Sequence, residues 1–106
     1  MKKWTVVNST DADENIINIY NYIADVLVEP FIALNQINRI NDAIDSLNEM
    51  PGRYPLYQGN SCQKDLHRMN VDNYSVFYQI FPDEDLVFVN TVIYGKRDID
   101  KVLDKL

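Results

Sequence analysis

Most of the side chains that could do chemistry lie in the second half of this 106-residue chain. They are basic or aromatic: Arg53, Tyr54, Tyr57, Lys64, His67, Arg68, Tyr74, Tyr78, Tyr94, Lys96 and Arg97. Arginine, lysine and tyrosine on one surface can grip a phosphate backbone and stack a base. The same cations can stabilise the negative charge that develops during phosphodiester cleavage. These residues therefore form the candidate site, either as a binding surface or as a catalytic one.

Each of these residues also has a purely structural interpretation. His67 is the only histidine, and a histidine among apolar strand neighbours can simply pack or hydrogen-bond. The arginines and lysines are equally compatible with solvated or ion-paired surface positions. Tyr74 and Tyr78 fit ordinary packing on a sheet. The residue types alone therefore leave both interpretations open.

The sequence lacks the patterns of several other kinds of site. Cys62 is the only cysteine, which excludes an internal disulfide and a multi-cysteine zinc site. The three glycines, Gly52, Gly59 and Gly95, lie too far apart for a dinucleotide-binding loop. Because no metal-ligand spacing and no nucleophile elbow is present, we expect neither a metal nor a cofactor.

The charge is unevenly distributed along the chain. With 16 acidic and 10 basic residues the net charge is −6, which disfavours nonspecific binding to a polyanion as a property of the whole protein. Residues 11–49 contain eight acids and a single base, Arg39. Apart from Lys2 and Lys3, the other bases follow residue 52, so a local basic patch can exist on an acidic protein.

The first half of the chain predicts a strand and two helices that could position this patch. Residues 4–8 are rich in aromatic and β-branched side chains, as in a short strand. Residues 9–29 begin with N-cap candidates and continue with apolar residues at helical spacing. Pro30 can begin a second helix over residues 30–50, and the two predict an antiparallel hairpin. We interpret both apolar stripes as core packing.

The second half predicts three strands and a short helix. A loop rich in proline and glycine covers residues 51–62. The strands and the terminal helix are expected at residues 66–71, 75–81, 86–94 and 98–106. Helices grouped on one face of a twisted, mostly antiparallel four-stranded sheet make an α+β fold. We expect a single domain over residues 1–106. Since no apolar run reaches the roughly 18 residues that a membrane helix needs, we also expect that the protein does not bind or cross a membrane and that it is cytoplasmic.

The ordered set of motifs resembles the RelE/ParE toxin superfamily over roughly residues 4 to 103. The residues that carry the resemblance are Ile19–Ala24, Pro30, Ala33, Ile40, Ile44, Leu47, Pro51–Tyr57, Leu66–Met69, Asn73–Ile80 and Val92–Ile99. The resemblance implies a helical hairpin packed against a twisted antiparallel sheet. It also implies the toxin of a bacterial type II toxin–antitoxin module, or plasmid stabilisation protein, whose partner is a cognate antitoxin that folds as it binds.

The superfamily divides by mechanism into two classes. RelE-like members are ribosome-dependent endoribonucleases that cut mRNA, whereas ParE-like members inhibit DNA gyrase. The resemblance places Arg97 and Lys96 at the basic pair of RelE-like enzymes, in which the arginine stabilises the scissile phosphate. It places Arg68 near a basic strand position of the same enzymes. However, Ser75 stands where the RelE-like pattern has a catalytic arginine, and the terminal helix lacks the aromatic or histidine of that pattern.

These two departures and the acidic charge favour a ParE-like growth inhibitor that acts on gyrase. The alternatives are a RelE-like mRNA interferase, which would make the chain an enzyme, and a degenerate, non-toxic binding domain. In the enzyme, Arg97, Arg68 and His67 are expected to be catalytic, with His67 as an acid or base. The residues expected to bind the target are Arg53, Lys64, Lys96 and Tyr94. We expect one functional face to hold Arg53, His67, Arg68, Lys96 and Arg97.

Overall fold

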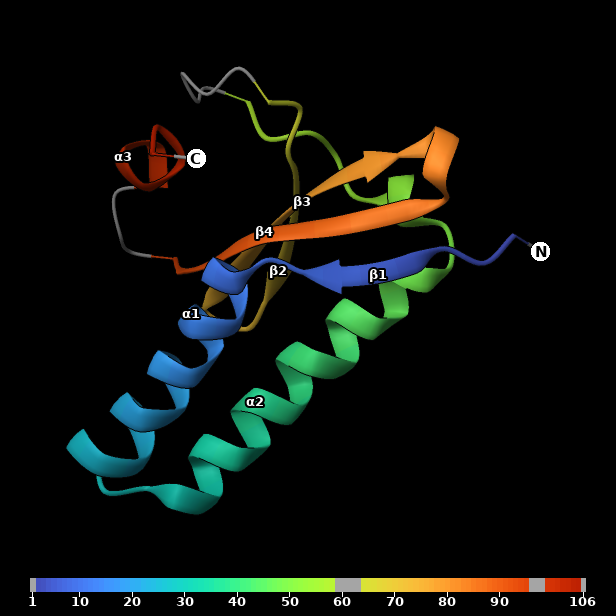
Figure 1. The fold of residues 1–106 in the computed structure, drawn as a ribbon. Coiled ribbons are helices and arrows are strands. Elements are labelled where there is room, and N and C mark those ends of the chain that lie inside the picture. Colours follow the sequence, from blue (N-terminus) through green and yellow to red (C-terminus); the bar gives the residue numbers. More distant parts are fainter. Residues whose placement is uncertain (1, 59–63, 96–98, 106) are drawn as a thin grey trace.

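The structure is a computed structural model that describes residues 2–58, 64–95 and 99–105. Four strands form one mixed sheet in the order β1-β4-β3-β2 (Figure 1). Their bounds are Thr5–Asn8 for β1, His67–Val71 for β2, Tyr74–Phe81 for β3 and Leu86–Tyr94 for β4. β1 runs parallel to β4, and the other two pairings are antiparallel. The predicted α+β fold with a mostly antiparallel four-stranded sheet is confirmed.

A helical hairpin follows β1, as predicted. Its segments are α1 (Thr10–Asn21), a π-helical turn (Tyr22–Val26), α2 (Pro30–Asp45) and a 3-10 turn (Ser46–Asn48). Ser9 caps α1, because its Oγ accepts a hydrogen bond of 2.9 Å from the Ala12 N–H. Pro30 occupies the first turn of α2, where its missing N–H costs nothing. The predicted N-cap of the first helix and the predicted proline start of the second are therefore confirmed.

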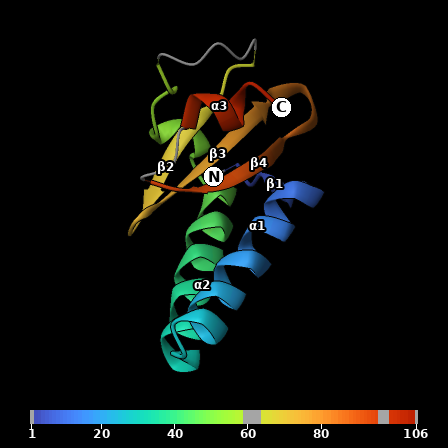
Figure 2. The same cartoon turned by 90° about the vertical axis from the view of Figure 1, so that its left-hand side faces the viewer.

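The hairpin covers one face of the sheet, and α3 (Ile99–Leu103) covers the other (Figure 2). The larger core lies under the hairpin and contains Ile16, Ile40, Ile44, Leu47, Met69, Val76, Tyr78, Val87, Val89 and Val92. A smaller core on the opposite face contains Leu66, Phe77, Ile93 and Leu103. The expectation that all helices share one face is therefore wrong for α3. In β3 and β4, apolar side chains point to both faces of the sheet. Both faces must therefore be shielded from water by packed helices.

Two contacts fix the hairpin to the sheet at the turn between β2 and β3. Arg39 Nε lies 2.7 Å from Asp72 Oδ2, and Gln36 Nε2 donates to the same oxygen at 2.9 Å. These hydrogen bonds lower the pKa of the Asp72 carboxyl below its ordinary value, and the bond from Arg39 has the larger effect. Arg39, the one base of residues 11–49, is therefore used within the fold.

α1 also completes the edge of β4 that the shorter β1 leaves open. Ser9 Oγ donates to the carbonyl oxygen of Asn90 at 2.7 Å. Asn15 Oδ1 accepts hydrogen bonds from the Val92 N–H at 3.0 Å and from Thr91 Oγ1 at 2.8 Å. Side chains of α1 thus replace a neighbouring strand along this part of β4.

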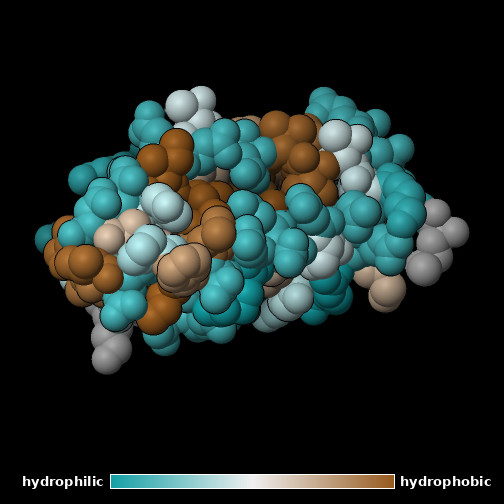
Figure 3. Space-filling view, turned by 90° about the horizontal axis from the view of Figure 1, so that it is seen from below, coloured by the Kyte–Doolittle hydropathy of each residue, from teal (hydrophilic) through white to brown (hydrophobic). Residues whose placement is uncertain are grey.

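The end of the hairpin extends past the sheet (Figure 1). The exposed apolar residues of this hairpin tip are Ile17, Tyr20, Tyr22, Val26, Leu27, Val28, Phe31, Ile32 and Leu34. Figure 3, which views the molecule from below, shows apolar side chains over this end of the hairpin among hydrophilic ones. The two stripes therefore pack in the core only along the inner part of the hairpin, because the sheet ends before the helices do. None of the described helices is both long and apolar enough to cross a membrane.

Candidate functional site

Arg68 is held on the outer face of the sheet, the face opposite the hairpin. It pairs across the β2–β3 ladder with Phe77, a residue of the smaller core. Its Nε donates to Asn70 Oδ1 at 3.1 Å and to Ser75 Oγ at 3.0 Å. Ser75 Oγ in turn donates to Asn70 Oδ1 at 2.9 Å. These three bonds orient the guanidinium group, whose two terminal nitrogens donate to no carboxylate in the described part of the chain.

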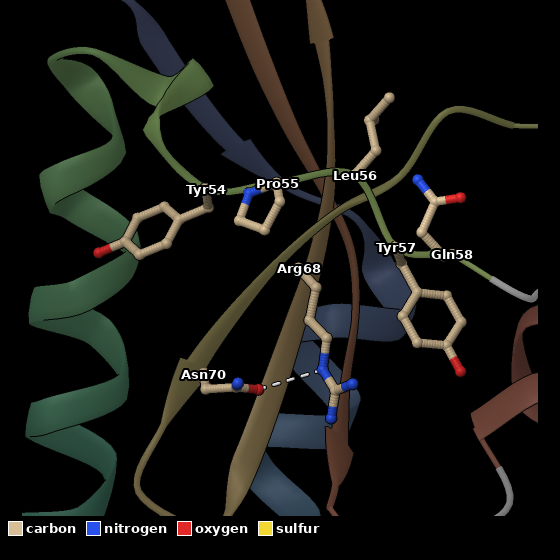
Figure 4. Close-up of a pocket in the computed structure, with 7 residues that line it drawn as sticks. All are labelled: Tyr54, Pro55, Leu56, Tyr57, Gln58, Arg68 and Asn70. Carbon is tan, nitrogen blue, oxygen red and sulfur yellow. Dashed lines mark hydrogen bonds between the residues drawn. The ribbon is translucent and has the colours of Figure 1, made fainter.

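The aromatic ring of Tyr57 forms one wall of the space around Arg68 (Figure 4). The guanidinium carbon of Arg68 lies 5.5 Å from the centroid of this ring, which is a favourable cation–π distance. The Tyr57 ring itself meets Phe77 edge to face, with centroids 5.4 Å apart. The result is a shallow pocket of about 490 Å³ lined by Tyr54, Pro55, Leu56, Tyr57, Gln58, Arg68 and Asn70.

His67 lies on the other face of the sheet, toward the hairpin. Its ring stacks on Tyr78 with centroids 5.2 Å apart and planes 16° from parallel. Its Nδ1 lies 2.6 Å from the carbonyl oxygen of Tyr54, and since that oxygen can only accept, Nδ1 carries the proton. The Tyr78 hydroxyl donates to the carbonyl oxygen of Pro51, and burial raises the pKa of Tyr78 well above its ordinary value. His67 therefore holds residues 51–54 against the sheet.

Arg53 also has a structural role in this arrangement. Its guanidinium donates to the carbonyl oxygens of Glu49 and Met50 and to Ser46 Oγ, the last at 3.0 Å. The guanidinium carbon lies 4.8 Å from the Tyr54 ring centroid. These contacts satisfy backbone carbonyls just beyond the C-terminal end of α2. Arg53 is thus engaged with its own chain.

The remaining predicted site residues are dispersed. Tyr94 faces the hairpin side, where its ring meets Tyr74 with centroids 5.6 Å apart, and it is 43% exposed. Lys64 is exposed on the segment that precedes β2. Lys96 and Arg97 lie outside the described residues, immediately after β4.

In the ranges that it describes, the structure does not bring Arg53, His67 and Arg68 onto one face. Successive residues of a strand point to opposite faces, so His67 and Arg68 are separated by the sheet itself. Only Arg68 of the described basic candidates lies beside the pocket at the outer face. Sequence reasoning did not identify Asn70, and it noted Ser75 only as a departure from the RelE-like pattern, whereas both residues orient Arg68. Among the described residues no three His, Cys, Asp or Glu side chains come together as they would to hold a metal ion.

Comparison with known proteins supports the resemblance at the level of sequence and of fold. No curated protein sequence matches the chain. A solved structure of a chromosomal ParDE toxin–antitoxin system from P. aeruginosa has a TM-score of 0.74 at 11% identity, covering 91% of this chain and 100% of that chain.

Two other solved structures are similar over most of their length. The toxin–antitoxin complex RelBE2 from Mycobacterium tuberculosis has a TM-score of 0.59 at 18% identity and covers 89% of this chain and 93% of that chain. An archaeal RelE–RelB complex from Pyrococcus horikoshii OT3 has a TM-score of 0.61 at 13% identity, with 92% and 99% covered. At these identities the likeness establishes the fold alone.

The sequence profile of one family decides the classification. That family is described as the ParE toxin of the type II toxin–antitoxin system parDE, and it matches residues 6–99. The match includes the hairpin, all of β2, β3 and β4, and the residues around Arg68. The chain therefore belongs to the ParE toxin family, within the RelE/ParE superfamily of type II toxins.

Proposed function

We propose that this protein inhibits bacterial growth by binding DNA gyrase, and that a cognate antitoxin neutralises it. Membership of the ParE toxin family supports the choice of target, which the family resemblance implies. The three similar solved structures are a ParDE system, a RelBE2 complex and a RelE–RelB complex, which supports an antitoxin as partner. Cytoplasmic action and a role in plasmid stabilisation follow from the same proposal.

His67 and Arg68 lie on opposite faces of the sheet, and this observation supports inhibition by binding over cleavage of RNA. Cleavage of RNA through its 2′-hydroxyl needs a general acid or base within hydrogen-bond reach of the reacting atoms. The described side chains that hydrogen-bond to the Arg68 guanidinium are Asn70 and Ser75, and an arginine does not release its proton. The hydroxyl of the neighbouring Tyr57 donates to Asp100 Oδ1 at 3.3 Å, so it is already engaged within the fold. Arg68 is instead well suited to hold a carboxylate or phosphate of a partner.

The charge of the hairpin supports the same mechanism. Residues 11–49 carry eight acids, and their single base is paired with Asp72. Such a surface is repelled by the phosphates of ribosomal RNA, whereas a protein target can offer complementary charge. We therefore expect the target to be a protein.

The alternative, a RelE-like mRNA interferase, is supported by a different observation. Two of the similar solved structures are RelE-type complexes, and Lys96 and Arg97 follow β4 in the order that RelE-like enzymes use. In that mechanism Arg68 would contact the scissile phosphate from the outer face. His67 would have no access to the reacting atoms from the hairpin side.

Two purified assays distinguish these mechanisms. We expect the chain to inhibit supercoiling by gyrase, and Arg68→Ala to weaken that inhibition about ten-fold without changing the circular dichroism spectrum. A ribosome programmed with mRNA should leave its message intact in the presence of the chain. Cleavage of the message with gyrase unaffected would replace the proposal by the interferase. A folded chain without effect in either assay would indicate the degenerate, non-toxic domain.

A further inference from the structure

The outer edge of β2 is covered along only half of its length. β2 is an edge strand, because it pairs with β3 alone in the order β1-β4-β3-β2. Residues 55–57 run beside its first half, where the Tyr57 N–H donates to the Leu66 carbonyl at 2.7 Å. The Arg68 N–H donates to the Pro55 carbonyl at 3.0 Å. These two bonds make a short antiparallel ladder around the bridge between Leu56 and His67.

This ladder ends because of a proline. An antiparallel partner opposite Arg68 would return a hydrogen bond from its own N–H to the Arg68 carbonyl. Pro55 has no N–H, so it can accept from Arg68 but cannot donate back. Beyond Pro55 the chain turns away into a 3-10 turn at Pro51–Arg53 that packs at the end of α2. In the part of the chain that the structure describes, the second half of β2 has no neighbouring strand on this side.

Asn70 presents its backbone to this open side. In an antiparallel strand the N–H and C=O groups of alternate residues point to the same side, so those of Asn70 point outward like those of Arg68. Within residues 2–58, 64–95 and 99–105, no main-chain group pairs with the outward N–H or C=O of Asn70. Asn70 is exposed, so these groups are accessible to a partner. An edge of this kind is a template for another strand.

A cation stands next to the open edge. The Arg68 guanidinium is fixed by Asn70 and Ser75 through its Nε, which leaves its terminal N–H groups available beside the pocket. In Figure 4, Arg68 and Asn70 lie along one strand below the segment that crosses it. Pro55 holds the position opposite Arg68, so an added strand begins opposite Asn70. A side chain at that position is a diagonal neighbour of Arg68, at about 7–8 Å, which is within reach of long side chains. A carboxylate placed there can form two parallel hydrogen bonds with the guanidinium.

We propose that the uncovered half of the β2 edge, residues 69–71, binds an extended acidic peptide segment of a partner protein as a fifth strand. Main-chain hydrogen bonds to Asn70 hold the segment, and its carboxylate pairs with Arg68. The segment is expected to be negatively charged, because the terminal N–H groups of Arg68 donate to no carboxylate among the described residues. The proposal rests on the geometry of this edge and holds whichever target the toxin inhibits.

Binding of a synthetic peptide tests the proposal on the full chain. The probe is a seven-residue, fluorescently labelled peptide that alternates valine and glutamate, and its control carries lysine in place of glutamate. We expect fluorescence anisotropy to report binding of the glutamate peptide and at least about ten-fold weaker binding of the lysine peptide. Nuclear magnetic resonance should show slower exchange of the Asn70 amide proton when the glutamate peptide is present.

A matched pair of variants separates the backbone from the side chain. Asn70→Pro and Asn70→Ala both remove the side-chain amide, but only the first removes the outward N–H. Proline is tolerated at an edge position whose N–H faces solvent, so both variants should fold. We expect Asn70→Pro to bind the glutamate peptide about ten-fold more weakly than Asn70→Ala. Arg68→Gln should weaken binding of the glutamate peptide and leave that of the lysine peptide unchanged.

Several results would overturn the proposal. Equal binding by folded Asn70→Pro and Asn70→Ala would exclude a main-chain contact at this residue. Protection of amides in β1 in place of Asn70 would assign the peptide to the opposite edge of the sheet. Absence of binding at millimolar peptide would exclude the fifth strand altogether. If Asn70→Pro does not fold, protection of the Asn70 amide in the natural chain decides the question alone.

Discussion

Arg68 donates a 3.0 Å hydrogen bond from its Nε to the hydroxyl of Ser75 across the β2–β3 pair. Ser75 is 1% exposed, and it also donates to Asn70 Oδ1. The position at which RelE-like enzymes carry a catalytic arginine is therefore occupied by a buried serine that orients a different arginine. An arginine at residue 75 would have to displace Arg68 or leave the sheet. The departure from the RelE-like pattern thus has a structural counterpart in this chain.

Removal of the serine hydroxyl should impair the function of Arg68. In Ser75→Ala the Arg68 Nε keeps only Asn70 as a partner, so the guanidinium is less well oriented. We expect a loss of about 1 kcal/mol in the free energy of unfolding and a several-fold weaker inhibition of the target. Urea denaturation and the supercoiling assay measure the two effects. Ser75→Thr keeps the hydroxyl and serves as the control, and inhibition that is equally strong in Ser75→Ala would show that the hydroxyl does not orient the site.

Substitution of His67 should affect stability and leave activity intact. His67→Phe keeps a ring to stack on Tyr78 but removes the hydrogen bond to the Tyr54 carbonyl, whereas His67→Ala removes both contacts. We expect unfolding free energies that fall by about 1 kcal/mol in the first variant and by more in the second. Growth inhibition per folded molecule should be unchanged in both. A stable His67→Phe protein without toxicity would return His67 to the list of catalytic residues.

Arg53 should behave as a stabilising residue of the hairpin. Arg53→Ala leaves the Glu49 carbonyl to water, while the Met50 carbonyl keeps its bond from the N–H of residue 53; we expect this loss to lower the free energy of unfolding by about 1 kcal/mol. Arg53→Lys should recover only part of this loss, because an ammonium cannot reach three acceptors in one plane. Thermal denaturation measures both variants, and Lys64→Ala at an exposed position is the control. A loss of target binding by folded Arg53→Ala would contradict this assignment.

Ionisation of Tyr78 should destabilise the protein at alkaline pH. Burial raises the pKa of the Tyr78 hydroxyl above its ordinary value of 10.0 in the folded protein. Below pH 10 the tyrosine is neutral in both the folded and the unfolded chain, so its contribution to stability is fully present. As the pH rises further the unfolded chain ionises first, and this contribution is progressively lost. Tyr78→Phe should be less stable at pH 7 and should lose less stability between pH 9 and pH 11 in urea denaturation. Parallel pH curves for the two proteins would contradict the burial effect.

The sequence predicted the elements well because the signals for them are local. The strand expected at residues 86–94 has those bounds in the structure, and Ser9 and Pro30 begin their helices as proposed. The hydrophobic stripes did not show how deeply each residue is buried, since Leu27 and Leu34 continue the helical spacing at the exposed end of the hairpin. Which part of a stripe is buried depends on the length of the element that covers it.

The candidate site was only partly predictable. The alternation of side chains in a strand already implied that His67 and Arg68 point to opposite faces, so a single face containing both was wrong. A two-residue turn at Asp72 and Asn73 would have placed Ser75 opposite Asn70, and therefore on the face of Arg68. The open edge at Asn70 was not predictable, because it depends on a long-range pairing that ends at Pro55.

The parallel pairing of β1 with β4 determines when the sheet can form during synthesis of the chain. Thr5 pairs with Leu86 and Asn8 with Val89, so the strand that leaves the ribosome first waits for the strand that is made last. The contacts between the two helices lie within residues 10–48 and can form early, whereas the contacts of the hairpin with β4 and the closure of the sheet need residues 86–94. A nascent chain therefore exposes the apolar side of its hairpin for most of translation. The complete sheet, and with it the larger core, therefore forms only once β4 has been made.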